Sequence, residues 1–298
     1  MVTFERLQNP LSALRCRAFT FPSYRPLLAD CVGNSSTVAV AAYAEREPIG
    51  LALAKVQPEN TTEILSLFVK PNYRNQGVGT ALLDALHKEL ALQGCRQLDI
   101  VYMTSASSPA LENILQKSGW STPEPRRLIC NFNCQSLLHL PWVQKPHRLP
   151  KGFNVFYWKD LKQQQRHSLT TPEANTWIPE DLHPFRYEED FDPASSLGIG
   201  HQGKVVGWML NHRISEDTVR FSSSYTSPSL QRRGRIIRLY AESIKQVSLQ
   251  PEITSILWTV PFVYPTMVNF CRRFSAHSTF CEESRGVSKV LANIPAFV

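Results

Sequence analysis

The chain has 298 residues, of which 43% are hydrophobic and 19% are charged. So many apolar residues can bury a core, which excludes a disordered chain, and the length suits one large domain or two ordinary ones. With 32 Lys and Arg against 25 Asp and Glu, the formal charge of +7 favours an anionic ligand but names none.

The first half of the chain alternates predicted strands with predicted helices. A strand and a helical region come first, and strands are expected at 37–45, 49–57 and 62–70. They are followed by a helix at 78–92, a strand at 97–103, a short helix at 108–118 and a strand at 126–133. Antiparallel strands that lead into a strand–helix–strand unit predict a mixed α+β sheet.

Residues 138–153, LHLPWVQKPHRLPKGF, read as a connector because their prolines lack the N–H group that a helix or sheet needs. We therefore expect domains at 1–137 and 154–298. The second half repeats the pattern, with strands near 196–202, 204–214 and 218–227, a helix at 235–248, a strand at 255–260, a short helix at 265–275 and a strand at 286–293. The proline-rich, acidic stretch 171–193 is expected to form a loop over a cleft.

The two halves match when the chain is shifted by 157 positions. IGLALAKV then lies over VGWMLNHR, and EILSLFVKPNYRNQGVG lies over RFSSSYTSPSLQRRGRI without a gap. Few residues are identical, but those that match are turn formers, which carry the most information about the backbone. The matched pairs are Gly50 with Gly207, Pro71 with Pro228, Arg74 with Gln231 and Gly77 with Gly234. This match predicts two tandem copies of one fold.

The remaining sequence signals exclude several classes of protein. The start, MVTFERLQNP, has no apolar signal core, and runs such as VAVAAYA are too short to span a bilayer. The odd number of cysteines, without a CxxC pair, predicts neither a disulfide framework nor a zinc site, and the histidines show no metal spacing. We expect a cytoplasmic protein with single buried thiols, no metal and no membrane contact. The cysteines are Cys16, Cys31, Cys95, Cys130, Cys134, Cys271 and Cys281.

The stretch VKPNYRNQGVGTALL, residues 69–83, places two glycines between a strand and a helix. The first amide groups of a helix have no partner inside it, and the helix dipole adds positive potential, so this junction is an anion site. Gly77 and Gly79 remove Cβ atoms that would keep a phosphate from the backbone, Thr80 adds a hydroxyl, and Arg74 adds a positive charge. The spacing matches neither GxxxxGK[ST] nor GxGxxG.

This pattern resembles the acetyl-CoA loop of the GNAT acyltransferase superfamily: Val69-Lys70-Pro71, then Arg74-Asn75-Gln76-Gly77-Val78-Gly79. The resemblance implies two tandem GNAT-like domains, each with a mixed, mostly antiparallel sheet flanked by helices, and an N-acetyltransferase that moves an acetyl group from acetyl-CoA to an amine. It also implies that the loop holds the pyrophosphate of CoA while the strand end splays from strand 97–103 and pairs with the pantetheine arm. The implied cofactor-binding residues are Leu67, Phe68, Val69, Arg74, Asn75, Gln76, Gly77, Val78, Gly79 and Thr80.

The resemblance also suggests catalytic groups. In histone-acetylating members a glutamate lies eleven residues before the Arg/Gln of the loop, and here that position is Glu63, which can be the base or a solvated strand-end charge. Many members protonate the departing thiolate with a tyrosine in the short helix, but Leu115 stands there. Tyr102 or Tyr73 can replace it or serve only in packing, and water can protonate the thiolate, whose pKa is about 8.5.

The second copy resembles the family less closely. Ile236 replaces the second glycine, Arg220 stands at the base position and Cys271 at the tyrosine position. We expect this half to be structural or to help form the acceptor pocket, although Arg232, Arg233 and Arg235 can attract CoA.

Two other functions stay open: a non-catalytic CoA-binding or sensor protein, and a basic module that binds nucleic acid through segments such as NFCRRFSAH. We expect a small-molecule or peptide amine as acceptor, no nucleic-acid partner, and a monomer or homodimer.

Overall fold

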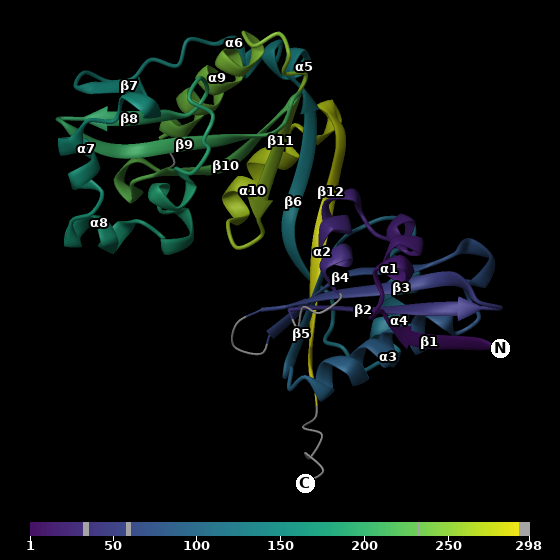
Figure 1. Cartoon of the computed structure of the whole chain (residues 1–298). Coiled ribbons are helices and arrows are strands. Elements are labelled where there is room, and N and C mark those ends of the chain that lie inside the picture. Colours follow the sequence, from purple (N-terminus) through teal and green to yellow (C-terminus); the bar gives the residue numbers. More distant parts are fainter. Residues whose placement is uncertain (32–35, 58–60, 232, 292–298) are drawn as a thin grey trace. The chain divides into compact units, whose positions relative to one another are not determined.

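The computed structural model in Figure 1 describes residues 1–31, 36–57, 61–231 and 233–291. Its contacts divide the chain into two compact units. Unit 1 holds residues 1–126 together with the described residues from 283 onward, and unit 2 holds residues 127–282.

Unit 1 is built from one sheet and two pairs of helices. Its strands are β1 (Val2–Arg6), β2 (Thr37–Ala44), β3 (Glu47–Val56), β4 (Thr61–Val69), β5 (Gln97–Met103) and most of β12 (Ser278–Val290). Its helices are α1 (Pro10–Arg15), α2 (Arg25–Asp30), α3 (Val78–Leu92) and α4 (Ser108–Lys117). The strand order is β1-β2-β3-β4-β5-β12, in which only β4 and β5 run parallel.

The sheet of unit 1 is covered on both faces. Alternate residues of β2 point to opposite faces, so Val38 and Val40 pack with α3 while Ala39 and Ala41 pack with α1 and α2. Helix α3 contributes a leucine stripe at three- and four-residue spacing, as an amphipathic helix does. This stripe consists of Leu82, Leu83, Leu86 and Leu90.

Unit 2 repeats the architecture with more helical turns. Its strands are β6 (Glu124–Asn133), β7 (Phe153–Tyr157), β8 (Leu197–His201), β9 (Lys204–Ser215), β10 (Thr218–Thr226) and β11 (Ser255–Pro261). Its helices are α5 (Cys134–Leu138), α6 (Pro141–Gln144), α7 (Gln163–Ser168), α8 (Pro172–Trp177), α9 (Arg235–Ser248) and α10 (Pro265–Arg272). The strand order is β6-β11-β10-β9-β8-β7, and only β10 and β11 are parallel.

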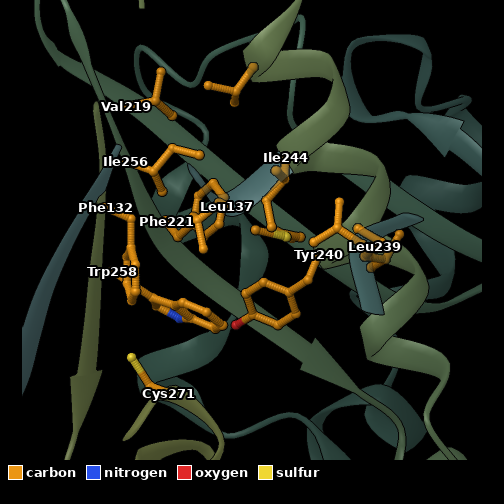
Figure 2. Close-up of a cluster of buried hydrophobic side chains, with 14 of the residues drawn as sticks. Phe132, Leu137, Val219, Phe221, Leu239, Tyr240, Ile244, Ile256, Trp258 and Cys271 are labelled. Atoms are coloured by element: carbon orange, nitrogen blue, oxygen red, sulfur yellow. The ribbon is translucent and has the colours of Figure 1, made fainter. Parts of the chain in front are cut away.

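The largest core of unit 2 lies between its sheet and α9. Figure 2 shows Tyr240 of α9 beside Trp258 of β11, whose ring centroids are 4.6 Å apart, with Phe132 of β6 in the same cluster. On the other face, Trp208 and Leu210 of β9 pack with Trp158 and Leu169. The alternation along β9, with Met209 in the first core, separates the two faces as sheet geometry requires.

The final strand of each half completes the sheet of the other unit. Within unit 1, Ser284–Val290 of β12 pairs antiparallel with Gln97–Met103 of β5. Within unit 2, Arg127–Asn133 of β6 pairs antiparallel with Ser255–Pro261 of β11. The contacts therefore divide the chain near 126 and 282, whereas the sequence places the boundaries at 137 and 153. The difference arises because strand pairing joins segments that are far apart in sequence.

The repeat predicted from the sequence has the same local geometry in both units. Pro71 and Pro228 each open a 3-10 turn, and Gly77 and Gly234 each precede the long helix with a positive φ, of 79° and 68°. A Cβ at Gly50 would lie 2.9 Å from the backbone oxygen of Phe68, and one at Gly207 would lie 3.0 Å from that of Tyr225. Both glycines thus allow the same close approach of neighbouring strands.

The predicted elements agree with the structure in most places, and the α+β class is confirmed. The sequence missed β7 within and after the connector, and it placed the start of β12 eight residues late. Residues 292–293 of the expected final strand and Arg232 lie outside the described residues.

The expectation of single thiols was wrong for one pair: Cys130 and Cys281 form a disulfide in unit 2, with Cα atoms 4.0 Å apart on β6 and β12. The other five cysteines are free and buried.

Candidate active site

The loop between β4 and α3 is tied to the end of its strand. Arg74 donates a hydrogen bond from Nε to the backbone oxygen of Val69 over 2.9 Å, and its guanidinium lies 5.8 Å from the centroid of the Phe68 ring. Phe68 in turn stacks on Phe19 with centroids 5.0 Å apart. Arg74 therefore positions the loop as well as adding positive charge to it.

The start of α3 presents a run of free backbone amides. Ala81 is the first helical residue to donate, to the oxygen of Gly77 over 3.0 Å. In the described part of the chain, the amides of Gln76, Gly77, Val78, Gly79 and Thr80 donate to no backbone or side-chain acceptor. Such amides together with the helix dipole make a site for an anion.

The two loop positions require glycine for different structural reasons. At Gly77 the reason is the left-handed backbone, with φ 79°, and not crowding, because a Cβ there would meet nothing within 4 Å. Gly79 needs space: a Cβ would lie 3.1 Å from Cδ1 of Ile114 and 3.8 Å from Cγ2 of Val69. Gly79 therefore also lets α3 approach α4 and β4, a packing role that the sequence pattern did not reveal. Asn75, at φ 60°, adds a second left-handed residue.

Strands β4 and β5 separate beyond their first three residues. Their parallel pairing covers Thr61–Glu63 of β4 and stops at Glu63 opposite Asp99. From there β4 pairs only with β3, while β5 pairs with β12. The edge of β4 that faces β5 from Ile64 to Val69 therefore has no strand partner among the described residues, and Leu65 is the extra residue of a bulge opposite Leu53 and Ala54. An extended ligand with amide groups can pair with such an edge.

Glu63 lies where this separation begins. Ile64 packs in the α3 core, so the alternation of the strand places Glu63 on the opposite face, toward α1 and α2. Glu63 is half-buried, and its Oε2 accepts a hydrogen bond from Nε2 of Gln57 over 3.3 Å. A carboxylate at this place can accept a proton from a group that enters from the α1–α2 side.

The candidate proton donors are already occupied or buried. Leu115 is 1% exposed in the core. The hydroxyl of Tyr102 donates to Oε1 of Glu112 over 2.7 Å, and Arg285 of β12 donates to the same oxygen over 2.9 Å. Burial and the adjacent Glu112 carboxylate raise the pKa of Tyr102, which makes it a weak acid. Tyr73 packs against the core cluster. Glu112 and Arg285 are a pair that the sequence could not reveal, since 173 positions separate them.

The corresponding strands of unit 2 also separate. The pairing of β10 with β11 stops at Phe221 opposite Trp258. A cavity of about 390 Å³ lies there, lined by residues of β10, β11, the start of α10 and the 179–182 segment. No local sequence pattern indicates this cavity, because its walls come from several separate segments, α9 among them.

The catalytic positions of unit 2 carry no comparable chemistry. Arg220 donates from Nε to Oγ of Ser222 over 3.1 Å. Cys271 is fully buried, and burial raises the pKa of its thiol to about 12. The 171–193 stretch, expected as a loop, contains α8 and two 3-10 turns. There Glu188 is held by Arg166 at 2.7 and 2.9 Å and by the indole N–H of Trp158 at 2.8 Å, so its carboxylate supports this stretch.

Comparison with known proteins gives a family match for part of the chain. Residues 7–119 match the model of the acetyltransferase (GNAT) family. These residues form a GNAT acetyltransferase domain. The separated strands β4 and β5 lie inside this domain. No curated protein matches the chain.

Solved structures show that the tandem arrangement of GNAT folds recurs. A tandem GNAT protein from the clavulanic acid biosynthesis pathway has a TM-score of 0.63 at 11% identity, over 97% of this chain and 98% of that chain. A GCN5-related N-acetyltransferase from Sphaerobacter thermophilus has a TM-score of 0.60 at 15% identity, over 96% of this chain and 95% of its own. These likenesses concern the fold and confirm the tandem GNAT architecture.

No group of three His, Cys, Asp or Glu side chains within the described ranges is placed to hold a metal ion. None of the described helices has the length and apolar character that a membrane crossing requires.

Proposed function

We propose that the protein is an acetyl-CoA-dependent N-acetyltransferase, with its active site in unit 1, that acetylates an amine of a small molecule or peptide. The observation that supports this best is the combination of two features: β4 loses its β5 partner after Glu63, and five free amides lie where the same strand leads into α3. The open strand edge and the amide loop are thus joined by a single stretch of chain.

The loop would hold the pyrophosphate of acetyl-CoA. The amides from Gln76 to Thr80 would donate to its oxygens, the Thr80 hydroxyl would add a donor, and Arg74 and Asn75 would lie beside the phosphates. The edge at Leu67, Phe68 and Val69 would pair with the amides of the pantetheine arm. A free N–H of β4 near the bulge would polarise the thioester carbonyl and stabilise its oxyanion.

The acceptor amine would lose its proton to Glu63, directly or through a water. The amine nitrogen then bonds to the acetyl carbon and the thiolate of CoA leaves, to be protonated by water because Leu115 and Tyr102 offer no ready donor. In this scheme the proton acceptor and the open strand edge belong to the same strand, β4.

The hydroxyl of Tyr102 is already bonded to Glu112, and this favours a second candidate function, a CoA-binding protein without turnover. Incubation of the protein with acetyl-CoA and a panel of amines, with free thiol as the readout, separates the two. Release of thiol that depends on an amine supports the transferase, and acetyl-CoA binding without any release supports the sensor.

A further inference from the structure

The cavity of unit 2 has a wall without charged side chains. It lies where the two strands separate, since β10 pairs only with β9 beyond Phe221 and β11 pairs only with β6 beyond Trp258. Among the described residues that line it, none is an Asp, Glu, Lys, Arg or His. An ionised group that left water for this wall would find no counter-charge, so its burial would be strongly unfavourable. The wall therefore selects a neutral ligand.

The inside of the cavity is rich in aromatic rings. The ring of Trp258 lies 4.6 Å from that of Tyr240 and 5.9 Å from that of Phe221, measured between centroids, and all three residues line the cavity (Figure 2). Tyr225 and Tyr264 add two further rings. Rings of this kind favour contact with another ring, which can stack on them or meet them edge-on.

The size of the cavity suits a small ring system. Its volume of about 390 Å³ is within the range of about 300–1,000 Å³ that ligand pockets occupy. Because each water takes about 30 Å³, the cavity has room for roughly a dozen non-hydrogen atoms. That number corresponds to a molecule of one or two aromatic rings.

Hydroxyl groups supply the polar part of the wall. Those of Ser224 and Tyr240 are bonded to each other over 2.6 Å. Thr259 and Thr266 also line the cavity, and within the described chain their hydroxyls have no hydrogen-bond partner. Each of these two hydroxyls can donate to a ligand oxygen or accept from a ligand hydroxyl.

The loop beside the cavity differs from the loop of unit 1 in two respects that matter for a phosphate. Ile236 lines the cavity and packs against the core, at the position that corresponds to Gly79 in unit 1. The amide of Arg233 donates to the backbone oxygen of Leu230 over 3.4 Å, whereas the corresponding amide in unit 1, that of Gln76, is free in the described chain. A ligand anchored by its phosphates is therefore disfavoured in unit 2.

We propose that the cavity of unit 2 binds a neutral small molecule of one or two aromatic rings that carries a hydroxyl or carbonyl group, and that it does so without CoA. The ligand rings lie against Trp258, Phe221 and Tyr240, and the polar group bonds to Thr259 or Thr266. The site takes part in no step of the acetyl transfer proposed for unit 1. Its existence therefore does not depend on that proposal.

Calorimetry of the full chain with three naphthalene probes tests the selection by charge. At neutral pH 2-naphthol is uncharged, 2-naphthoate is an anion and 2-naphthylmethylamine is a cation. We expect one site for 2-naphthol with a Kd of about 100 µM or tighter, and binding of both charged probes that is at least about tenfold weaker. Saturating octanoyl-CoA should leave the 2-naphthol affinity within about twofold, because the site does not use CoA. Absence of a 2-naphthol site, equal affinity for the three probes, or displacement by octanoyl-CoA would overturn the proposal.

Two variants locate the site. Thr259→Trp fills the cavity from a half-buried position and should weaken 2-naphthol binding at least about tenfold. Thr266→Trp changes an exposed lining residue, where a large side chain is tolerated more easily, and should weaken binding at least about threefold. Leu249→Trp adds the same ring at a position of unit 2 that is 73% exposed and outside the lining, and should change nothing.

Thermal unfolding shows which variants are folded, and the exposed position of Thr266 keeps the test decisive if Thr259→Trp does not fold. A folded variant at either threonine that retains the parental affinity for 2-naphthol would show that the cavity is not the site. A failure of acetyl-CoA to bind or to react, with 2-naphthol binding intact, contradicts only the function proposed for unit 1.

Discussion

Arg74 donates from Nε to the backbone oxygen of Val69 over 2.9 Å, and so joins the end of β4 to the loop before α3. The same relationship occurs in unit 2, where Nε2 of Gln231 donates to the backbone oxygen of Thr226 over 3.0 Å. The two copies thus keep the bond that shapes the loop but differ in the charge of the residue that makes it. Shape and charge can therefore be tested separately.

Arg74→Gln should preserve the fold and weaken acetyl-CoA binding. Gln231 shows that glutamine can make the bond to the strand end, so the free energy of unfolding should change by less than about 0.5 kcal/mol. The lost exposed charge should weaken acetyl-CoA binding roughly two- to fivefold and flatten its dependence on salt. Calorimetry at two salt concentrations measures both effects. Unchanged affinity and salt dependence would mean that Arg74 has only a structural role.

Glu63→Gln should slow transfer without loss of acetyl-CoA. A primary amine is nearly all protonated at neutral pH, and a positioned base contributes about 10²–10⁴ in rate. We expect kcat to fall by roughly 10² or more, acetyl-CoA affinity to stay within about threefold, and the acidic limb of the pH–rate profile to flatten. Screening of amines and peptides must first supply an acceptor.

The matched control for Glu63 is its neighbour across the parallel pair, Asp99. Asp99→Asn removes a carboxylate from the next strand and should leave the pH–rate profile unchanged. If Glu63→Gln keeps the parental rate, or if Asp99→Asn loses activity instead, Glu63 is not the base.

His87 should make the protein less stable in mild acid. Burial lowers the pKa of His87 to about 4, while an unfolded chain has a histidine pKa of about 6.5. The unfolded state therefore binds more protons between these two pH values, and the free energy of unfolding falls as the pH drops through this window. The contribution of His87 to this fall should be roughly 2–3 kcal/mol between pH 7 and 4.5.

The test compares urea unfolding of the parent and of His87→Phe at both pH values. Phenylalanine keeps a ring against Trp120, whose centroid lies 5.7 Å from that of His87, and removes the titration. His277→Gln, at an exposed position, is the control. An equal loss of stability in the parent and in His87→Phe would show that other groups cause the acid sensitivity.

The sequence was sufficient for features that depend on local backbone chemistry. Proline and glycine positions located the turns of both copies, so that Pro71, Gly77 and Gly234 marked the same junctions that the structure contains. Hydrophobic alternation then placed most strands and both long helices. These signals are local, since a turn or a helix start is decided within a few residues.

Features that depend on distant pairing could not be predicted in this way. Neither the exchange of β6 and β12 nor the contact of Arg285 with Glu112 leaves a local pattern. The disulfide likewise joins two residues, Cys130 and Cys281, that 151 positions separate. The loop and the catalytic positions of unit 2 do not indicate its cavity, because the cavity depends on where β10 and β11 separate.

Calorimetry that compares acetyl-CoA binding by Gly77→Ala and Gly234→Ala tests whether the cofactor binds at the loop of unit 1. Both glycines have a positive φ and open space around a Cβ, so each change should cost about 1–2 kcal/mol of strain in the equivalent loop. If acetyl-CoA binds at the loop of unit 1, Gly77→Ala should weaken it roughly tenfold while Gly234→Ala leaves it within twofold. An acetyl-CoA affinity that falls with Gly234→Ala and not with Gly77→Ala would show that the cofactor does not bind at the loop of unit 1.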